Sequence, residues 1–170
     1  MEASVRTQEF DSIADRAARV LILGTLPSQV SLQKGEYYAQ PQNVFWKIMA
    51  DLFCLDSLAS YSARTNCLIS KGVALWDFCH SAHRPGSLDA SIRDDEPNDF
   101  AEFLRSHENL RLICFNGKKA TNIYHRRAKR SKELEAIAVE VLPSTSAAHA
   151  AMPYKVKLAR WSIVCNQCET

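Results

Sequence analysis

The sequence has no apolar stretch long enough to cross a membrane. Its apolar runs are short, as at 20–23, whereas a transmembrane helix needs about 20 apolar residues in a row. The first ten residues carry acidic side chains and lack the apolar run of a secretory signal. We therefore expect a cytoplasmic protein of a prokaryotic-type cell.

Metal-ligand patterns are also scarce. Cys165 and Cys168 have C-x-x-C spacing, but the other four cysteines form no second pair of this kind. A structural zinc or iron–sulfur site needs further ligands at suitable spacing. We therefore expect no metal and no cofactor, and we interpret the two residues as reduced thiols in a C-terminal tail.

Internal repeats and low-complexity linkers are missing from the 170 residues as well. Hydrophobic residues make up 46% and charged residues 24% of the chain, which is the balance of a globular domain. We expect a single domain over residues 1–170, with a core of about 18–163 and mobile tails at both ends.

The net charge is only +2, so the overall charge says little about partners. The stretch 118–132 departs from this balance because it holds no acidic residue. Its basic residues are Lys118, Lys119, Arg126, Arg127, Lys129, Arg130 and Lys132. Such a cluster either contacts phosphates or forms a solvated helix face and loop, and charge alone leaves both interpretations open.

Four apolar segments predict strands, at 20–23, 73–76, 110–115 and 138–142. Helical spacing or capping residues predict helices at 43–52, 57–70, 98–104, 118–127 and from 152 onwards. The segments 24–42 and 80–98 are rich in loop-forming residues and predict loops. Strands that alternate with helices indicate an α/β fold with a four-stranded, mainly parallel sheet flanked by helices.

Ligands of such folds bind at the carboxyl ends of the strands. The loops at that edge are 24–43, 76–83, 116–119 and 143–151. In the first of them, Gly24 permits a close backbone approach, and Tyr37 and Tyr38 are adjacent aromatic residues. An aromatic ring can stack on a nucleobase. The alternative is that one tyrosine packs on the sheet while the other meets solvent.

Five segments in order resemble the motifs of the uracil-DNA glycosylase superfamily. They are G-T-L-P with G-E-Y-Y-A-Q-P-Q-N-V-F-W at 24–46, G-V-A-L-W-D-F at 72–78, G-S-L-D-A-S-I-R-D-D-E-P-N-D-F at 86–100, F-N-G-K-K-A at 115–120 and L-P-S-T-S-A-A-H-A at 142–150. The sequence is most similar to the hypoxanthine-DNA glycosylases (family 6). The resemblance implies a four-stranded parallel sheet flanked by helices, a metal-free site, and hydrolysis of the N-glycosidic bond after base flipping.

Two positions depart from the uracil-specific members of the superfamily. Those enzymes carry an Asp, and the mismatch-specific branch an Asn, near the start of the first motif, where this chain has Thr25-Leu26-Pro27. The His that begins their last motif is replaced by Leu142. The ordinary carboxylate general base is therefore missing from that position, which argues against uracil as the main substrate.

The resemblance implies that Asn43, in the P-x-N-x-F-W element, is the catalytic residue. An amide can orient a water molecule through its carbonyl oxygen and stabilise charge by hydrogen bonding. Asn43 also precedes a predicted helix, where an Asn can serve only as a cap. Both interpretations stay open.

The expected base-binding residues are Tyr38, Asn116, Asp77, Gly24 and Thr25. By resemblance, Tyr38 stacks on the flipped base and Asn116 contacts the edge of the base, although Asn-Gly is also a common turn pair. Asp77 follows a predicted strand. It either accepts a hydrogen bond from hypoxanthine N1–H or holds a neighbouring group in place.

The last motif resembles the loop that enters the minor groove and fills the gap left by the flipped base. The residues expected to contact DNA, through hydroxyl groups, an imidazole and a helix N-terminus, are Ser144, Thr145, Ser146, His149, Lys118 and Lys119. An ordinary Ser/Thr turn is the alternative for the loop. Ala147 stands where family members usually have Pro.

We therefore expect a monofunctional, monomeric glycosylase that removes hypoxanthine, the deamination product of adenine, from DNA in base excision repair. No Lys stands where a Schiff-base nucleophile is expected, which argues against a lyase step. Three alternatives remain: a uracil or G:U mismatch glycosylase, a DNA-lesion binder without turnover, and a hydrolase of free deoxyinosine.

Overall fold

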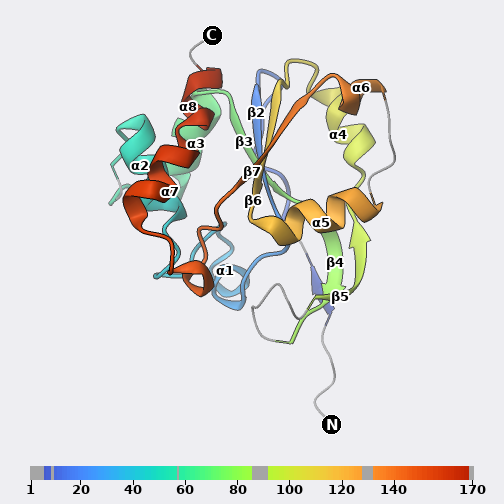
Figure 1. Cartoon of the computed structure of the whole chain (residues 1–170), viewed down its shortest axis with the longest axis horizontal. Coiled ribbons are helices and arrows are strands. Elements are labelled where there is room, and N and C mark those ends of the chain that lie inside the picture. The colour runs from blue at the N-terminus through green and yellow to red at the C-terminus, as the bar shows by residue number, and fades with distance from the viewer. Residues whose placement is uncertain (1–5, 9, 57, 86–91, 128–131, 169–170) are drawn as a thin grey trace.

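A four-stranded parallel sheet forms the centre of the computed structural model, which describes residues 6–8, 10–56, 58–85, 92–127 and 132–168 (Figure 1). Its strands, in the order β3-β2-β6-β7, are β3 Val73–Asp77, β2 Val20–Gly24, β6 Leu112–Asn116 and β7 Ala138–Leu142. All neighbouring pairs run parallel. The predicted α/β fold and its four strands are confirmed.

Helices cover both faces of this sheet. Figure 1 shows α2 Phe45–Phe53, α3 Tyr61–Ser70, α7 Tyr154–Trp161 and α8 Ile163–Cys168 on one side, and α4 Phe100–Ser106, α5 Lys118–Arg127 and α6 Lys132–Glu135 on the other. Each side has its own cluster of buried side chains. All five residues of β2 are buried between the two clusters, as its unbroken apolar run requires. None of the described helices is long and apolar enough to span a membrane.

A second, antiparallel sheet lies beside the first. Its strands, in the order β1-β4-β5, are β1 Arg6–Gln8, β4 Cys79–His83 and β5 Arg93–Pro97. The prediction of a loop over 80–98 is therefore wrong for these two segments. The sequence did not indicate β5, because Asp, Glu and Pro are depleted in strands. The register between β5 and β4 shifts twice. Residues 86–91, which belong to the third matching motif, lie outside the described part of the chain.

Two further differences concern the first predicted loop and the second predicted helix. The segment 24–42 contains the short helix α1 Gln29–Lys34, which starts where Ser28 Oγ accepts a hydrogen bond from the Ser31 N–H and ends at Gly35 with φ +66°. Six residues are too few for a visible helical period. Helix α3 begins at Tyr61 and not at 57, because Ser60 caps it by accepting from the Ala63 N–H.

Both ends of the chain carry elements beyond the predicted core of about 18–163. Strand β1 pairs with β4 near the N-terminus, and α8 extends to Cys168. The Cys165 thiol lies 3.2 Å from the Leu52 carbonyl oxygen, within α8 and against α2. The C-x-x-C pair is therefore part of a helix. In the described part of the chain, no group of three or more metal-ligand side chains comes together.

Candidate active site

A cavity of about 240 Å³ opens at the carboxyl ends of the parallel strands, the edge where the sequence places its functional loops. Segments from every part of the chain line it: residues 24–28, Ser31, Tyr38, Asn43, Asp77, Arg84, Asn116, residues 144–146, Ala148 and His149. The structure thus brings all of the predicted catalytic and base-binding residues to one place. Lys118 and Lys119 are the two predicted site residues that do not line the cavity.

The floor of the cavity is a close contact between two neighbouring strands. Gly24 at the end of β2 pairs in register with Asp77 at the end of β3, and the Asp77 side chain is only 3% exposed. A Cβ atom at position 24 would lie 2.5 Å from Asp77 Oδ1 and 3.2 Å from the Tyr38 hydroxyl oxygen. Only glycine leaves room for this carboxylate and this phenol together.

The two adjacent tyrosines have different surroundings. Tyr37 is buried, its hydroxyl donates to the Asp11 carbonyl oxygen at 3.2 Å, and Trp46 Nε1 donates to its carbonyl oxygen. Tyr38 adopts φ +55° and turns into the cavity, with its ring stacked on Phe45 at a centroid distance of 3.9 Å. Because Phe45 covers one face of the Tyr38 ring, a ligand cannot stack on that face.

Asn43 both caps the start of α2 and faces the cavity, so its catalytic role stays a prediction. Its Oδ1 accepts a hydrogen bond of 2.9 Å from the Phe45 N–H, at the first residue of α2. The same side chain lines the cavity. A carbonyl oxygen has two lone pairs, so the bond to Phe45 fixes the amide while one acceptor position remains for a water molecule.

Asn116, at the end of β6, is held by Thr145 on both atoms of its amide. Its Oδ1 accepts from the Thr145 N–H at 2.9 Å, and its Nδ2 donates to Thr145 Oγ1 at 2.9 Å. The backbone N–H can only donate, so it determines which side of the amide is oxygen. One amide hydrogen and one lone pair of Asn116 remain for a ligand.

Thr145 is therefore an exception among the hydroxyl groups expected to meet DNA. It is 1% exposed, its hydroxyl is bonded to Asn116, and its carbonyl oxygen accepts from the Val44 N–H at 3.0 Å. The expected contact between Thr145 and phosphate is corrected, because this side chain lies inside the loop and joins it to β6 and α2. Ser144 and Ser146 are half-buried and His149 is exposed at the cavity edge.

Two side chains of helix α7 hold the backbone of the same loop. Lys157 Nζ donates to the carbonyl oxygens of Ser144 and His149, at 2.8 Å each, and Trp161 Nε1 donates to the Pro143 carbonyl oxygen at 2.9 Å. Lys157 is 4% exposed, and burial lowers the pKa of its ammonium group. Lys157 is not among the site residues predicted from the sequence. Its signal was a position one helical turn before the buried Trp161.

Arg84 is a second buried cation that is not among the residues predicted from the sequence. It follows β4, is 4% exposed and lines the cavity. Its guanidinium donates to the carbonyl oxygens of Leu26 and Pro27 in the loop after β2. No sequence signal pointed to it, because the surrounding segment was predicted to be a loop.

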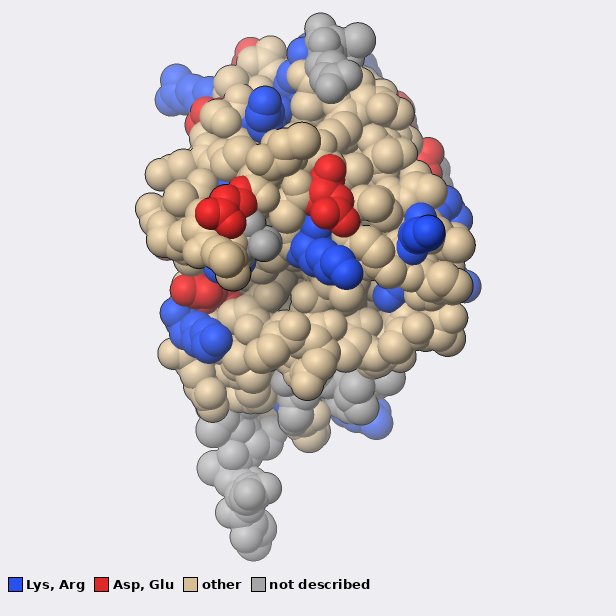
Figure 2. Space-filling view, turned by 90° about the vertical axis from the view of Figure 1, so that its left-hand side faces the viewer, with Lys and Arg blue, Asp and Glu red and all other residues tan. Residues whose placement is uncertain are grey.

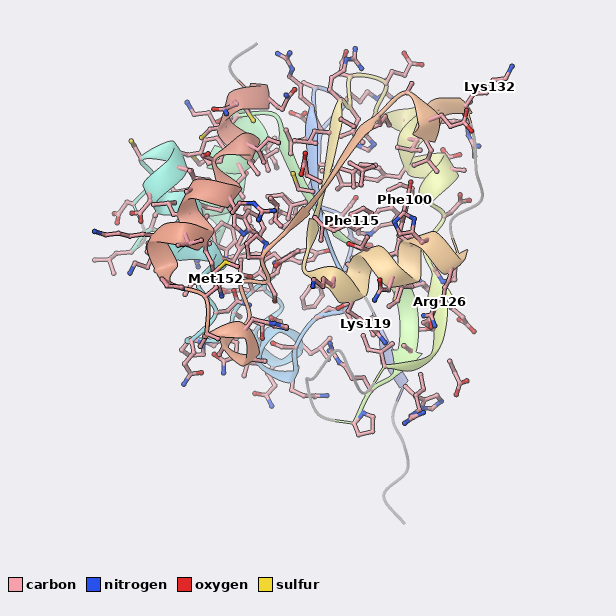
Figure 3. The ribbon with its side chains drawn as sticks, in the orientation of Figure 1. Phe100, Phe115, Lys119, Arg126, Lys132 and Met152 are labelled. Carbon is pink, nitrogen blue, oxygen red and sulfur yellow. The ribbon has the colours of Figure 1, made fainter. Side chains whose placement is uncertain are left out.

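The basic stretch 118–132 does not form one cluster. Figure 3 shows Lys119 and Arg126 at α5 but Lys132 at the opposite end of the sheet. Arg126 forms an ion pair of 3.2 Å with the buried Asp95, so its charge is locally balanced. Residues 128–131, which hold Lys129 and Arg130, lie outside the described part of the chain.

The face over α2, α7 and α8 carries charges of both signs. Figure 2 shows Lys and Arg side chains beside Asp and Glu side chains on this face. One such group joins Lys47, which lies 4.2 Å above the Tyr154 ring, and Asp51, which accepts from the Tyr154 hydroxyl at 2.5 Å. A phosphate backbone would therefore meet charges of both signs on this face.

A family model described as the uracil DNA glycosylase superfamily matches residues 10–163. The chain belongs to this superfamily. The resemblance inferred from the five sequence segments is thereby confirmed, and the chain is a DNA glycosylase, a hydrolase of N-glycosyl bonds.

Two named relatives come from Methanosarcina species. A Methanosarcina barkeri protein named hypoxanthine DNA glycosylase is 35% identical over 117 residues, which cover 68% of this chain and 74% of that protein. A Methanosarcina acetivorans protein of the same name is 39% identical over 113 residues, covering 65% and 71%. The solution NMR structure of a candidate uracil DNA glycosylase from Methanosarcina acetivorans is 32% identical, with a TM-score of 0.84, over 98% of this chain and 100% of that one.

Proposed function

We propose that this glycosylase hydrolyses the N-glycosidic bond of deoxyinosine in DNA and releases hypoxanthine, without a lyase step. Two relatives named for this base support the substrate. The observation that carries the proposal is the meeting of Asn43, Asp77 and Asn116, from three separate segments, on one cavity at the strand ends. Each of these residues belongs to a different one of the five matching sequence segments.

The cavity would bind the base after it has left the DNA stack, because an enzyme cannot reach its target atom inside a duplex. The base stacks on the face of Tyr38 that Phe45 leaves open. Asp77 accepts a hydrogen bond from N1–H of hypoxanthine. Adenine has a lone pair at N1 and no hydrogen, so the carboxylate would repel it, and this difference selects the deaminated base.

Bond cleavage moves negative charge onto the leaving base and positive charge onto the sugar. Donors that are fixed before the reaction stabilise such charge best, and the remaining N–H of Asn116 is such a donor. Asn43 orients the attacking water beneath C1′ through its carbonyl oxygen. The C1′–N9 electron pair leaves with the base, the water oxygen bonds to C1′, and one water proton passes to solvent.

The DNA strand is proposed to lie over the loop after β7. Ser144, Ser146 and His149 lie at this edge, where hydroxyl and imidazole groups can donate to phosphate oxygens. Lys118 and Lys119, in the first turn of α5, extend the surface without lining the cavity. We propose that one copy of the chain acts on DNA by itself.

The proposal is tested by incubating the protein, in the presence of EDTA, with matched duplexes that carry one inosine or one uracil, and scoring alkali-labile sites. Cleavage at inosine and not at uracil is expected. Cleavage mainly at uracil would overturn the substrate assignment, and binding to inosine DNA without abasic product would make the protein a lesion binder. Cleavage of free deoxyinosine would indicate a nucleoside hydrolase. Trapping of a DNA adduct with borohydride would contradict the absence of a lyase step.

A further inference from the structure

Lys157 is a buried cation whose partners, among the described residues, are carbonyl oxygens of the loop after β7. It is 4% exposed, and its ammonium group donates at 2.8 Å to both Ser144 and His149. Burying a charge is unfavourable unless hydrogen bonds compensate for the lost hydration. An apolar side chain of similar size would fill the same space without that cost. What the charge provides is a firm hold on two carbonyl groups.

One of those carbonyl groups belongs to a peptide that Asn116 holds from the other side. In a trans peptide the C=O and the following N–H point in opposite directions. The Ser144 C=O points to Lys157, and the Thr145 N–H points to Asn116 Oδ1 at 2.9 Å. Lys157 and Asn116 therefore bind the two ends of one peptide group, and the orientation of this peptide determines where the Asn116 oxygen lies.

We propose that Lys157 is a positioning residue, which orients the Asn116 amide toward the base through the Ser144–Thr145 peptide. Its effect on turnover rests on the proposed function of the cavity, whereas its effect on Asn116 does not. Without the ammonium group the peptide can rotate about its flanking bonds. Asn116 then loses the N–H that distinguishes its oxygen from its nitrogen, and the amide samples both orientations.

The loop itself offers no other cation for this task. Residues 142–153 contain neither Lys nor Arg. The other α7 side chain that binds the loop, Trp161, is neutral and donates to the Pro143 carbonyl oxygen. Among the described residues, Asn116 is held by Thr145 on both amide atoms. Of the contacts that α7 makes with the loop, the one from Lys157 to Ser144 therefore reaches the peptide that binds Asn116, whereas those to His149 and Pro143 hold the loop on either side of it.

The test replaces Lys157 by methionine, which keeps the length of the side chain and removes its donors. Lys155→Met is the matched control, because Lys155 lies on the same helix, is exposed, and loses the same charge. Lys157→Arg is the conservative variant, which restores donors and charge. Lys157→Gln keeps N–H donors without the charge.

Two measurements are made on each variant. Single-turnover cleavage of an inosine duplex is expected to slow by about 10- to 100-fold in Lys157→Met, as for a small misplacement of a site group. The rate should recover in part in Lys157→Arg and stay unchanged in Lys155→Met. The side-chain amide signals of Asn116, identified in ¹⁵N spectra by their loss in Asn116→Ala, are expected to shift in Lys157→Met and Lys157→Gln and to stay in place in Lys155→Met.

A folded Lys157→Met protein with wild-type Asn116 amide signals and a rate within about twofold of wild type would overturn the proposal, since misplacement costs far more. Should the variants not fold, nuclear Overhauser contacts between the Asn116 amide protons and Thr145 test the geometry in the wild-type chain, and their absence would also overturn it. A wild-type protein that does not cleave inosine DNA rejects the proposed function, while the amide signals still test the link from Lys157 to Asn116.

Discussion

The two loops that form the walls of the cavity are held in contrasting ways. The wall after β2, residues 24–43, rests on buried aromatic rings and on the contact between Gly24 and Asp77. The wall after β7, residues 143–149, consists of small and polar residues, and polar side chains from α7 and β6 hold its backbone. The first wall combines aromatic packing with hydrogen bonds from Arg84 to the Leu26 and Pro27 carbonyl oxygens, whereas the second wall is held mainly by hydrogen bonds to its backbone.

This difference separates two tasks. A base site must present a fixed shape, and close packing resists displacement because cores respond to changes as small as one methylene group. A surface that meets a DNA strand has to offer donors and tolerate adjustment. We therefore expect changes in the first wall to reduce bond cleavage steeply, and changes in the second to have graded effects.

The largest effect is expected for Asn43→Ala, in the first wall. Loss of the amide removes the proposed water-orienting group, and cleavage of inosine DNA should fall by about 100- to 1000-fold. The lost bond to the Phe45 N–H should cost about 1 kcal/mol of unfolding free energy. Asn43→Ser separates the two roles, since Ser is a good cap, and is expected to restore stability but not activity. The exposed neighbour Gln42→Ala is the control, and activity of Asn43→Ala within a few-fold of wild type removes the catalytic role.

Gly24→Ala is expected to come next. The new Cβ would lie 2.5 Å from Asp77 Oδ1, so the carboxylate must leave its place. Activity on inosine should fall by about 100-fold, and overpacking should cost about 1–3 kcal/mol of stability, measured by urea unfolding. The double variant Gly24→Ala with Asp77→Ala removes the clash and should regain stability without activity. Equal activity of Gly24→Ala and wild type on inosine would mean that Asp77 does not contact the base.

Thr145→Val tests the second wall with a smaller change. Valine keeps the shape and loses the hydroxyl that accepts from Asn116 Nδ2, while the backbone bond to Asn116 Oδ1 stays. We expect a loss of about 1 kcal/mol of stability and a decrease in cleavage of about tenfold. Thr121→Val is the control, because Thr121 is also buried and bonds to a carbonyl oxygen. A decrease as large as that of Asn43→Ala would contradict the graded response of this wall.

The smallest expected effect is the contribution of Lys157 to the pH dependence of the unfolding free energy. Burial lowers the pKa of its ammonium group below the usual 10.5, so the unfolded chain holds this proton more tightly than the folded one. Wild type should therefore gain stability relative to Lys157→Met as the pH rises from the lowered pKa toward 10.5, and the difference should be constant at lower pH. Denaturant unfolding of both proteins over this range measures it. The opposite slope would mean that the Lys157 ammonium group stabilises the folded chain relative to the unfolded chain.

Much of the fold could be predicted because apolar runs are local signals. The four central strands and the helix α5 lie where periodicity and turn residues placed them. The antiparallel sheet could not be predicted, since β5 carries charged residues at the edge of a small sheet and depends on its pairing with β4. Helix α1 was too short to show a period.

Most of the predicted site residues could be found because they follow the strands directly. Gly24, Asp77 and Asn116 end three neighbouring strands, and parallel strands carry their carboxyl ends to one edge. Arg84 and Lys157 escaped notice because a charged residue is ordinarily exposed. Arg84 lies against the distant loop after β2, and Lys157 lies against the loop that precedes its own helix.

The sequence by itself thus determined the layered fold, the edge at which the site forms and most of the side chains that line it, because strand periodicity and strand ends are local properties. The tertiary structure decided which groups control those side chains. It turned Thr145 inward, dispersed the basic stretch, and placed Lys157 behind the loop it holds. These outcomes depend on how loops, strands and helices pack against one another. The free energy of burying a charge or a hydroxyl group depends on its partners in the folded chain, and no local sequence pattern reveals those partners.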